Sequence, residues 1–188
     1  MSTLRWFERV FLIIGIGCLG WAGATWVEAY RFQHQQGGVF EVSGRTSQRA
    51  TAVRPDAVEA PAPIGRLRIP RVGVSVVVMP GDDHATLSKA VGHLSDTKFP
   101  WNGGNTALAG HRDTFFQPLE RVQAGDEIHF ETSRGRFQYR VRRTLVVEPE
   151  DLWVLDQSAT PTLTLITCYP FRYIGPAPKR FIVQADRV

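Results

Sequence analysis

From residue 64 onward, apolar and polar residues alternate over short distances along the chain. Short alternating or apolar segments occupy residues 65–69, 72–79, 106–109, 127–132, 137–141, 144–147, 162–167 and 180–185. β-Branched and aromatic residues are common in these segments, and Gly, Pro, Asn or Asp residues separate many of them. This arrangement is typical of short β-strands joined by turns.

Helical spacing is confined to two short places. Asp82 or Asp83 can cap a helix that continues through Leu87 to Val91, and residues 112–119 contain a helical turn with several aromatic side chains. Because strands outnumber helices so clearly, the pattern predicts an all-β sandwich or barrel with one or two short helices.

The N-terminal part of the chain has a different pattern. Residues 10–27 contain no charged side chain, which meets the lower length limit of a bilayer-spanning helix. Arg5 and Arg9 precede this segment, so the charge bias favours a cytoplasmic N-terminus. A small-residue pattern at residues 22–24 leaves a cleaved signal peptide as the alternative. We expect an uncleaved transmembrane signal anchor at residues 1–30, because apolar residues continue beyond that pattern.

Residues 31–63 are expected to form an extended linker. They contain Gly-Gly, Gln-Gln and an Ala-Pro repeat at residues 60–63, and they show no sustained hydrophobic period. Such a segment cannot bury a core, and its Ala-Pro end should be stiff and extended. The folded domain is therefore predicted to cover residues 64–188, which is an ordinary size for one domain.

Charge and composition narrow the range of functions. The 188-residue chain has a net charge of +4, but its arginines are scattered and do not form a basic block. Nucleic-acid binding is therefore not expected. Cys18 and Cys168 are the two cysteines of the chain, and Cys18 lies in the apolar N-terminal segment, where it cannot easily reach Cys168. An exported domain would then carry a single free thiol. An unpaired structural cysteine is a liability in an oxidising compartment, so the presence of this thiol suggests that it has a function.

Candidate chemistry gathers at the ends of the predicted strands. His111 follows the strand at residues 106–109, Cys168 follows the strand at 162–167, and Arg180 opens the last strand. An imidazole beside a thiol promotes formation of the nucleophilic thiolate, and a guanidinium stabilises the oxyanion of a tetrahedral intermediate. Taken alone, Cys168 is better interpreted as a small core residue, since free cysteine is commonly buried.

Longer motifs around these residues resemble those of bacterial sortases, and they are most similar to class D sortases. The motifs are GHRDTFF at residues 110–116, TLITC at 164–168 and Arg180 at the start of the final strand. The resemblance covers roughly residues 63–188 and includes residues 81–83, 90–93 and 104–109. It implies a closed eight-stranded β-barrel preceded by the N-terminal transmembrane helix.

The resemblance also implies an activity. Sortases are membrane-anchored cysteine transpeptidases that cleave a Leu-Pro-x-Thr-Gly-like C-terminal sorting signal after the Thr and transfer the product to an amine. By the matching motifs, Cys168 would be the nucleophile that forms the thioester, and His111 the general acid and then the general base. Arg180 would bind substrate carbonyls and stabilise the oxyanion.

Further expectations concern the surroundings of these three residues. Thr167, Tyr169 and Asp113 are expected to help bind substrate or shape the site, and no cofactor or metal is expected. The expected partners are surface proteins that carry the sorting signal, an amine acceptor in the envelope and membrane lipid around the N-terminal helix. The catalytic domain would then lie outside the cytoplasm on a single-pass anchor. Two alternatives stay open: a cysteine peptidase that only hydrolyses its peptide, and a non-catalytic membrane-tethered barrel that binds a peptide or wall component.

Overall fold

The computed structural model describes residues 61–188 without a gap, together with residues 7, 9, 11–20, 23, 27, 30 and 31 of the N-terminal segment. Residues 11–20 are helical and exposed. Within the residues described, no helix combines the length and apolar character needed to span a membrane. Much of the expected anchor at residues 1–30 and nearly all of the expected linker lie outside the described residues, so both stay predictions.

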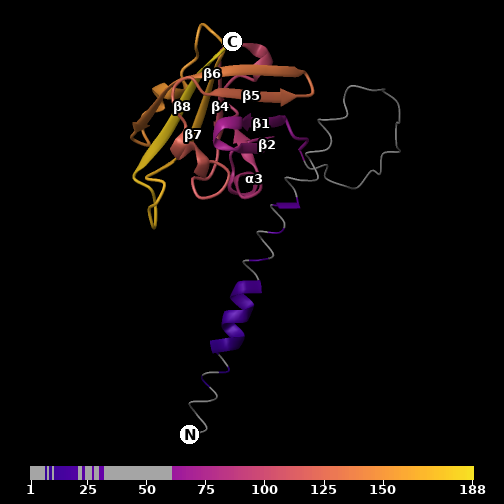
Figure 1. The fold of residues 1–188 in the computed structure, drawn as a ribbon, viewed down its shortest axis with the longest axis vertical. Coiled ribbons are helices and arrows are strands. Elements are labelled where there is room, and N and C mark those ends of the chain that lie inside the picture. Colours follow the sequence, from indigo (N-terminus) through magenta and orange to yellow (C-terminus); the bar gives the residue numbers. More distant parts are fainter. Residues whose placement is uncertain are drawn as a thin grey trace, which may run out of the picture.

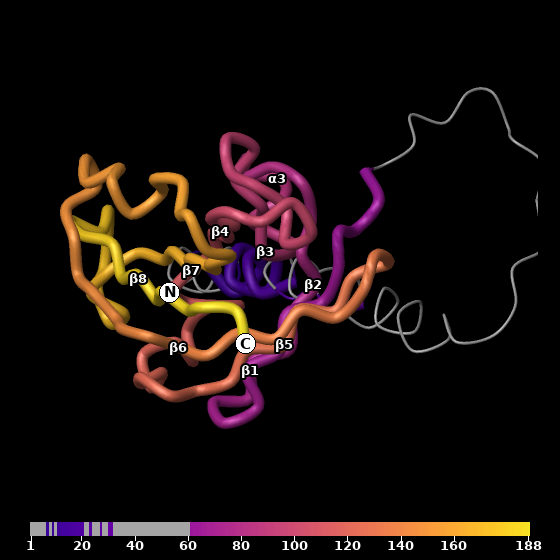
Figure 2. Tube along the Cα trace, turned by 90° about the horizontal axis from the view of Figure 1, so that it is seen from above, coloured from indigo at the N-terminus to yellow at the C-terminus, as the bar shows by residue number. Residues whose placement is uncertain are grey.

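Eight strands form a closed barrel (Figure 1). They are β1 (Gly65–Ile69), β2 (Val74–Pro80), β3 (Val91–His93), β4 (Asn105–Ala109), β5 (Glu127–Thr132), β6 (Gly135–Val147), β7 (Thr162–Tyr169) and β8 (Lys179–Arg187). The strand order around the barrel is β1-β2-β3-β4-β7-β8-β6-β5, and the view from above shows the strands surrounding a common centre (Figure 2). The predicted closed eight-stranded barrel is therefore confirmed.

Most neighbouring strands in the barrel are antiparallel, but β2–β3 and β4–β7 are parallel pairs. The helices are short, as predicted: one α-helix and four 3-10 helices lie within residues 61–188. They are α3 (His84–Leu87), η1 (Pro70–Val72), η2 (Pro100–Asn102), η3 (Gln117–Arg121) and η4 (Leu152–Leu155). Each occupies a connection between strands.

The predicted helix that continued to Val91 is too long. Asp83 does cap α3, with its carboxylate accepting hydrogen bonds from the backbone N–H groups of Ala85 and Thr86. The helix ends at Leu87, however, and residues 91–93 form β3 instead. This strand lies between β2 and β4, so closure of the barrel requires an extended backbone here. The helical spacing of Leu87, Ala90 and Val91 reflects burial, and the tertiary context decides the conformation.

The structure also sets two strand boundaries that the sequence pattern left open or placed differently. The segments at residues 137–141 and 144–147 are one long strand, β6, with a β-bulge between Val141 and Arg143. A bulge inserts an extra residue and shifts the alternation of side chains, which made a single strand look like two. In β7, the strand continues through Tyr169, so Cys168 lies within the ladder rather than after it.

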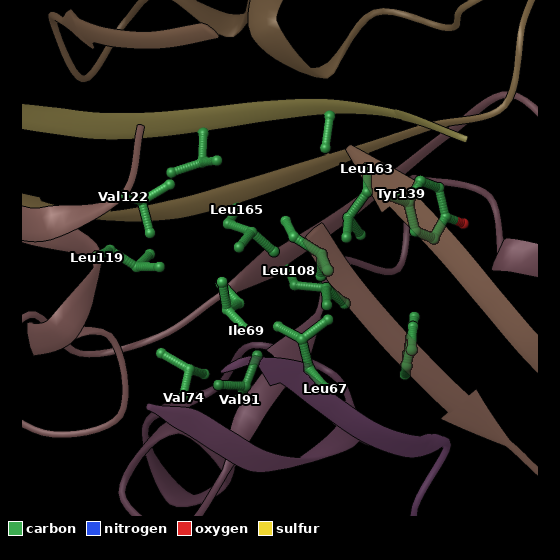
Figure 3. Packing of buried hydrophobic residues seen from close by; sticks show 14 of the residues in the cluster. Leu67, Ile69, Val74, Val91, Leu108, Leu119, Val122, Tyr139, Leu163 and Leu165 are labelled. Atoms are coloured by element: carbon green, nitrogen blue, oxygen red, sulfur yellow. The ribbon is translucent and has the colours of Figure 1, made fainter. Parts of the chain in front are cut away.

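Side chains from most of the strands fill the barrel (Figure 3). The fully buried members of this core include Leu67, Ile69, Val91, Leu108, Phe130, Leu163 and Leu165. Tyr139 is also buried, and burial raises the pKa of its phenol to about 12. A hydrogen bond to Thr106 provides a partner for the phenol hydroxyl. The interior is therefore a packed core rather than a channel.

A second, smaller cluster lies on the outer face of β6, β7 and β8. Val154 of η4 packs there with Val147, Ile166 and Ile182. Since side chains alternate along a strand, Leu163 and Leu165 point into the barrel while Ile166 points outward. The same alternation directs Cys168 to the outer face, two residues beyond Ile166.

The packing around His93 of β3 can be tested through the pH dependence of the protein's stability. Its ring is buried, stacks on Phe99 with centroids 4.4 Å apart, and has Nε2 3.2 Å from the carbonyl oxygen of Lys98. Burial lowers the pKa of His93, although the hydrogen bond with Lys98 opposes this shift. The folded protein therefore binds fewer protons at this position than the unfolded chain does.

We expect this contribution to stability to be complete above about pH 6.5, the ordinary pKa of histidine, and to be lost as the pH falls below that value. His93→Phe keeps a flat aromatic ring but cannot be protonated, so its free energy of unfolding should fall less on acidification. Urea unfolding of both proteins at about pH 7.5 and about pH 5 measures this difference. Equal losses of stability in the two proteins would show that His93 does not titrate on unfolding.

Candidate active site

The residues expected to perform chemistry lie in or directly after three adjacent strands. β7 lies between β4, with which it runs parallel, and β8, with which it runs antiparallel. Cys168 is directly paired with Arg180 across the β7–β8 ladder. Paired residues project their side chains to the same face of a sheet, so the thiol and the guanidinium stem start on a common side.

His111 approaches Cys168 from the other neighbouring strand. The last regular pair between β4 and β7 joins Ala109 to Ile166, and the Gly110 N–H donates to the Ile166 carbonyl at 3.1 Å. This hydrogen bond continues the ladder past the end of β4. Extending the parallel register by two residues places His111 opposite Cys168. Cys168 thus stands in the central strand, with His111 and Arg180 on its two flanks.

Thr167 joins the strand of Cys168 to the turn that carries His111. Its hydroxyl donates to the carbonyl oxygen of Gly110 at 2.7 Å, and the residue is only 2% exposed. Because neighbouring residues of a strand alternate in direction, the Thr167 side chain points away from the face that carries Cys168. Its contribution visible in the structure is therefore to hold the two strand ends together.

Gly110 permits close packing beneath the turn that carries His111. A Cβ atom at Gly110 would lie 2.7 Å from Cδ2 of Phe116, which is too short a distance for a normal contact. Phe116 is fully buried in the barrel core, and its backbone N–H donates to the His111 carbonyl at 3.0 Å. The Gly-His sequence therefore allows a buried aromatic ring to anchor the turn.

A buried amide fastens the same strands at their opposite ends. The Asn105 side chain donates to the carbonyl oxygens of Val154 at 3.1 Å and Asp156 at 3.3 Å. Its own oxygen accepts hydrogen bonds from the hydroxyls of Thr162 and Thr164. Asn105 therefore links β4 to β7 and to the η4 region that covers the outer face. Nothing in the sequence alone indicated that Asn105 links these parts of the structure.

The guanidinium of Arg180 is held in part by hydrogen bonds to backbone carbonyls that lie just before it in the chain. Nη1 donates to the carbonyl oxygens of Ala177 at 3.2 Å and Lys179 at 3.0 Å. A guanidinium has five N–H donors, and these two bonds leave three others without a partner among the described residues. Arg180 is half-buried, so these donors are available at the edge of the site.

Two further arginines, Arg112 and Arg172, lie close in sequence to His111 and Cys168, and the structure gives them different surroundings. Arg112 follows His111 directly, and its Nη2 donates to the carbonyl oxygens of Tyr173 at 2.7 Å and Gly175 at 3.1 Å. The Arg172 side chain is 86% exposed, and its nearest acidic partner is Glu120 at 3.9 Å. Arg112 therefore connects the His111 turn to the β7–β8 loop, defined here as residues 170–178. Sequence spacing gave no indication of this long-range contact.

The remaining expected site residues are less closely associated. Tyr169 is half-buried, and its ring packs against those of Phe171 and Phe181, at centroid distances of 6.1 Å and 6.3 Å. By strand alternation its side chain lies on the face opposite Cys168. Asp113 is exposed, and no hydrogen bond or ion pair holds its side chain within residues 61–188. Over the described part of the chain, no three His, Cys, Asp or Glu side chains gather closely enough to hold a metal ion.

Comparison with known proteins gives this geometry a context. Residues 67–188 match the family model described as the sortase domain. Sortase D of Bacillus subtilis (strain 168) is 38% identical over 125 residues, which are 66% of this chain and 63% of that protein. The chain thus matches somewhat less than two thirds of the length of that curated relative.

Solved structures agree with the sequence comparison. A Sortase D5 transpeptidase from Clostridium perfringens superposes with a TM-score of 0.61 at 31% identity, covering 67% of this chain and 79% of that one. A lid mutant of Sortase A from Corynebacterium diphtheriae gives a TM-score of 0.64 at 30% identity, covering 70% of this chain and 73% of that one. The residues that match the sortase family model, 67–188, contain β4, β7 and β8.

The contact between Thr167 and Gly110 can be tested through stability. Thr167→Val keeps the shape of the side chain but removes the hydroxyl donor, so the free energy of unfolding should fall by about 1–2 kcal/mol. Thr167→Ser retains the hydroxyl and should keep the hydrogen bond, losing only the packing of one methyl group. Urea unfolding of the three proteins measures the effect. Equal stability of the valine variant and the unmodified protein would rule out a stabilising role for this bond.

Proposed function

Because the chain belongs to the sortase family, we propose that it is a cysteine transpeptidase that cleaves a Leu-Pro-x-Thr-Gly-like sorting signal after the Thr. The acyl group then passes to an amine acceptor. One observation carries the proposal: Cys168 and Arg180 are register partners, and the β4–β7 ladder leads His111 toward the same point. A thiol, an imidazole and a guanidinium are the groups that acyl transfer through a thioester requires.

The first half of the reaction forms the acyl-enzyme. The Cys168 thiolate attacks the carbonyl carbon of the substrate Thr, and the carbonyl oxygen becomes an oxyanion in the tetrahedral intermediate. As this intermediate collapses, the C–N bond to the following Gly breaks and the thioester remains on Cys168. His111, in its imidazolium form, donates the proton that the departing amine needs.

The second half returns the enzyme to its starting state. An acceptor amine attacks the thioester carbonyl while neutral His111 takes up a proton from the nitrogen. A new amide bond forms, the C–S bond breaks, and the Cys168 thiolate is released beside protonated His111. Water in place of the amine would give hydrolysis, so the acceptor decides between transfer and peptidase activity.

Arg180 stabilises the charge that develops during both halves. Two of its N–H groups are used by the carbonyls of Ala177 and Lys179, which restrict the guanidinium before substrate arrives. The other N–H groups are free to donate to the oxyanion or to a substrate carbonyl. A donor that is already oriented needs little reorganisation when the charge appears, which is the main advantage of such a site.

The cellular setting follows from the sequence expectations. We propose that residues 1–30 anchor the protein in the cell membrane, with the N-terminus in the cytoplasm and the barrel outside. Surface proteins bearing the sorting signal would be the acyl donors, and an envelope component or another protein would supply the amine. Anchoring beside the membrane would place the barrel near secreted substrates as they emerge.

The covalent step gives a direct test of Cys168 and His111. With a sorting-signal peptide, the unmodified protein should show an acyl-enzyme mass that hydroxylamine releases, because a thioester is readily cleaved by that nucleophile. Cys168→Ala should show no adduct, and His111→Ala should lower kcat/KM by about 10³-fold or more. Arg136→Ala serves as the control, since it removes an exposed charge from β6, outside both this set and the β7–β8 loop. Turnover by Cys168→Ala would disprove the proposed mechanism.

Arg180 and the acceptor require a separate experiment. Arg180→Met should lower kcat/KM by about 10²–10³-fold, the usual cost of removing an oxyanion donor. Mass analysis of products from the unmodified protein, with and without a glycine-based amine, distinguishes transfer from hydrolysis. We expect an amide-linked product when the amine is present. Hydrolysed peptide alone over a wide amine range would favour the peptidase alternative.

A further inference from the structure

The β7–β8 loop, residues 170–178, borders the candidate active site because it joins the strand of Cys168 to the strand of Arg180. Its tip is exposed, and Ile174 reaches full exposure, at 101%. Within residues 61–188, the hydrogen bonds that hold residues 173–175 both come from Nη2 of Arg112. The same guanidinium lies 5.8 Å from the centre of the Tyr173 ring, within the range of a cation–π contact.

The attachment joins two parts of the site that are distant in sequence. Arg112 is the neighbour of His111, and the carbonyl oxygens it binds lie 61 and 63 residues further along the chain. Its contacts are with backbone atoms, so they constrain the path of the loop itself. A loop that is held in one path loses less conformational entropy when it closes on a ligand than a loop without such contacts.

The environment of the other terminal nitrogen of Arg112 points in the same direction. Nη1 is buried and has no hydrogen-bond partner among the described residues. A buried donor without a partner is unfavourable, and each such group in a native protein calls for an explanation. The hydrogen bonds from Nη2 to the loop supply one, because they fix the plane of the guanidinium and with it the position of Nη1.

We propose that Arg112 is a positioning residue that fixes the β7–β8 loop in the path required for peptide binding. The inference rests on the proposed function for its kinetic consequence, but the structural restraint on the loop is independent of catalysis. Arg112 takes no proton and forms no bond with the reacting atoms. Arg112 determines the fraction of enzyme molecules whose β7–β8 loop follows the path required for binding. It therefore affects the apparent affinity for the peptide.

The restraint itself is tested without any substrate. Chymotrypsin cleaves after Tyr173 only when the loop opens, and mass spectrometry of the full-length protein follows cleavage between Tyr173 and Ile174. Arg112→Met keeps the length of the side chain but removes its donors, so cleavage should become roughly tenfold faster. Arg112→Lys retains a charged donor group that can reach toward both carbonyls, and it should give an intermediate rate.

Arg136→Ala is the matched control for these variants. It removes the same charge from a side chain that is 80% exposed and lies in β6, outside the β7–β8 loop. Its cleavage rate should equal that of the unmodified protein. Far-ultraviolet circular dichroism and the thermal midpoint identify any variant that fails to fold, and the lysine variant then carries the test. Equal cleavage rates for Arg112→Lys, Arg112→Met and the unmodified protein would overturn the proposal.

The kinetic test separates positioning from a direct catalytic role. For Arg112→Met we expect KM for a sorting-signal peptide to rise about tenfold while kcat stays within about twofold, with partial recovery of KM in Arg112→Lys. A fall in kcat at unchanged KM would overturn the positioning role. If the unmodified protein turns over no peptide, the proposed function fails, but the cleavage experiment still decides whether Arg112 restrains the loop.

Discussion

Parallel pairing of β4 with β7 is the constraint on which the candidate site depends. Parallel strands finish at the same edge of a sheet, so the residues that follow β4 emerge beside the end of β7. Two hydrogen bonds extend this alignment past the regular ladder, one from the Gly110 N–H to Ile166 and one from the Thr167 hydroxyl to Gly110. At the opposite ends of the strands, Asn105 secures the same pair. His111 and Cys168 are thus aligned by the backbone pairing of the strands that carry them.

The two faces of β7 explain why the thiol is half-buried. Inward-facing Leu163 and Leu165 are sealed in the barrel core, while outward-facing Ile166 is covered by the apolar side chains around η4. Cys168 is the next outward-facing residue, and it lies where this cover ends. The strand therefore provides a rigid, well-packed support up to the position of the nucleophile. The β7–β8 loop, in contrast, is exposed at its tip and is tied back to the His111 turn through Arg112.

Arginines contribute to this protein in ways that depend on their partners. Arg71 binds the buried carboxylate of Asp126, and this hydrogen-bonded guanidinium holds the pKa of Asp126 below its usual range. Arg180 is oriented by carbonyls of its own loop, whereas Arg112 reaches across to carbonyls of a distant loop. The planar fork of donors suits all of these tasks, and a lysine would not match its geometry. The same residue type thus supports the fold, the proposed oxyanion site and the loop.

The sequence by itself determined the all-β class, the positions of most strands and the motifs around His111, Cys168 and Arg180. These features depend on local alternation and on short motifs, which a linear chain displays directly. Only the tertiary structure decided that residues 91–93 form a strand and that residues 135–147 form one bulged strand. It also decided that Arg112 binds the β7–β8 loop backbone while the Arg172 side chain is exposed. Each of these depends on pairing or contact between segments far apart in the chain. Local propensity carries no information about such partners, because their energies arise only when the barrel has closed.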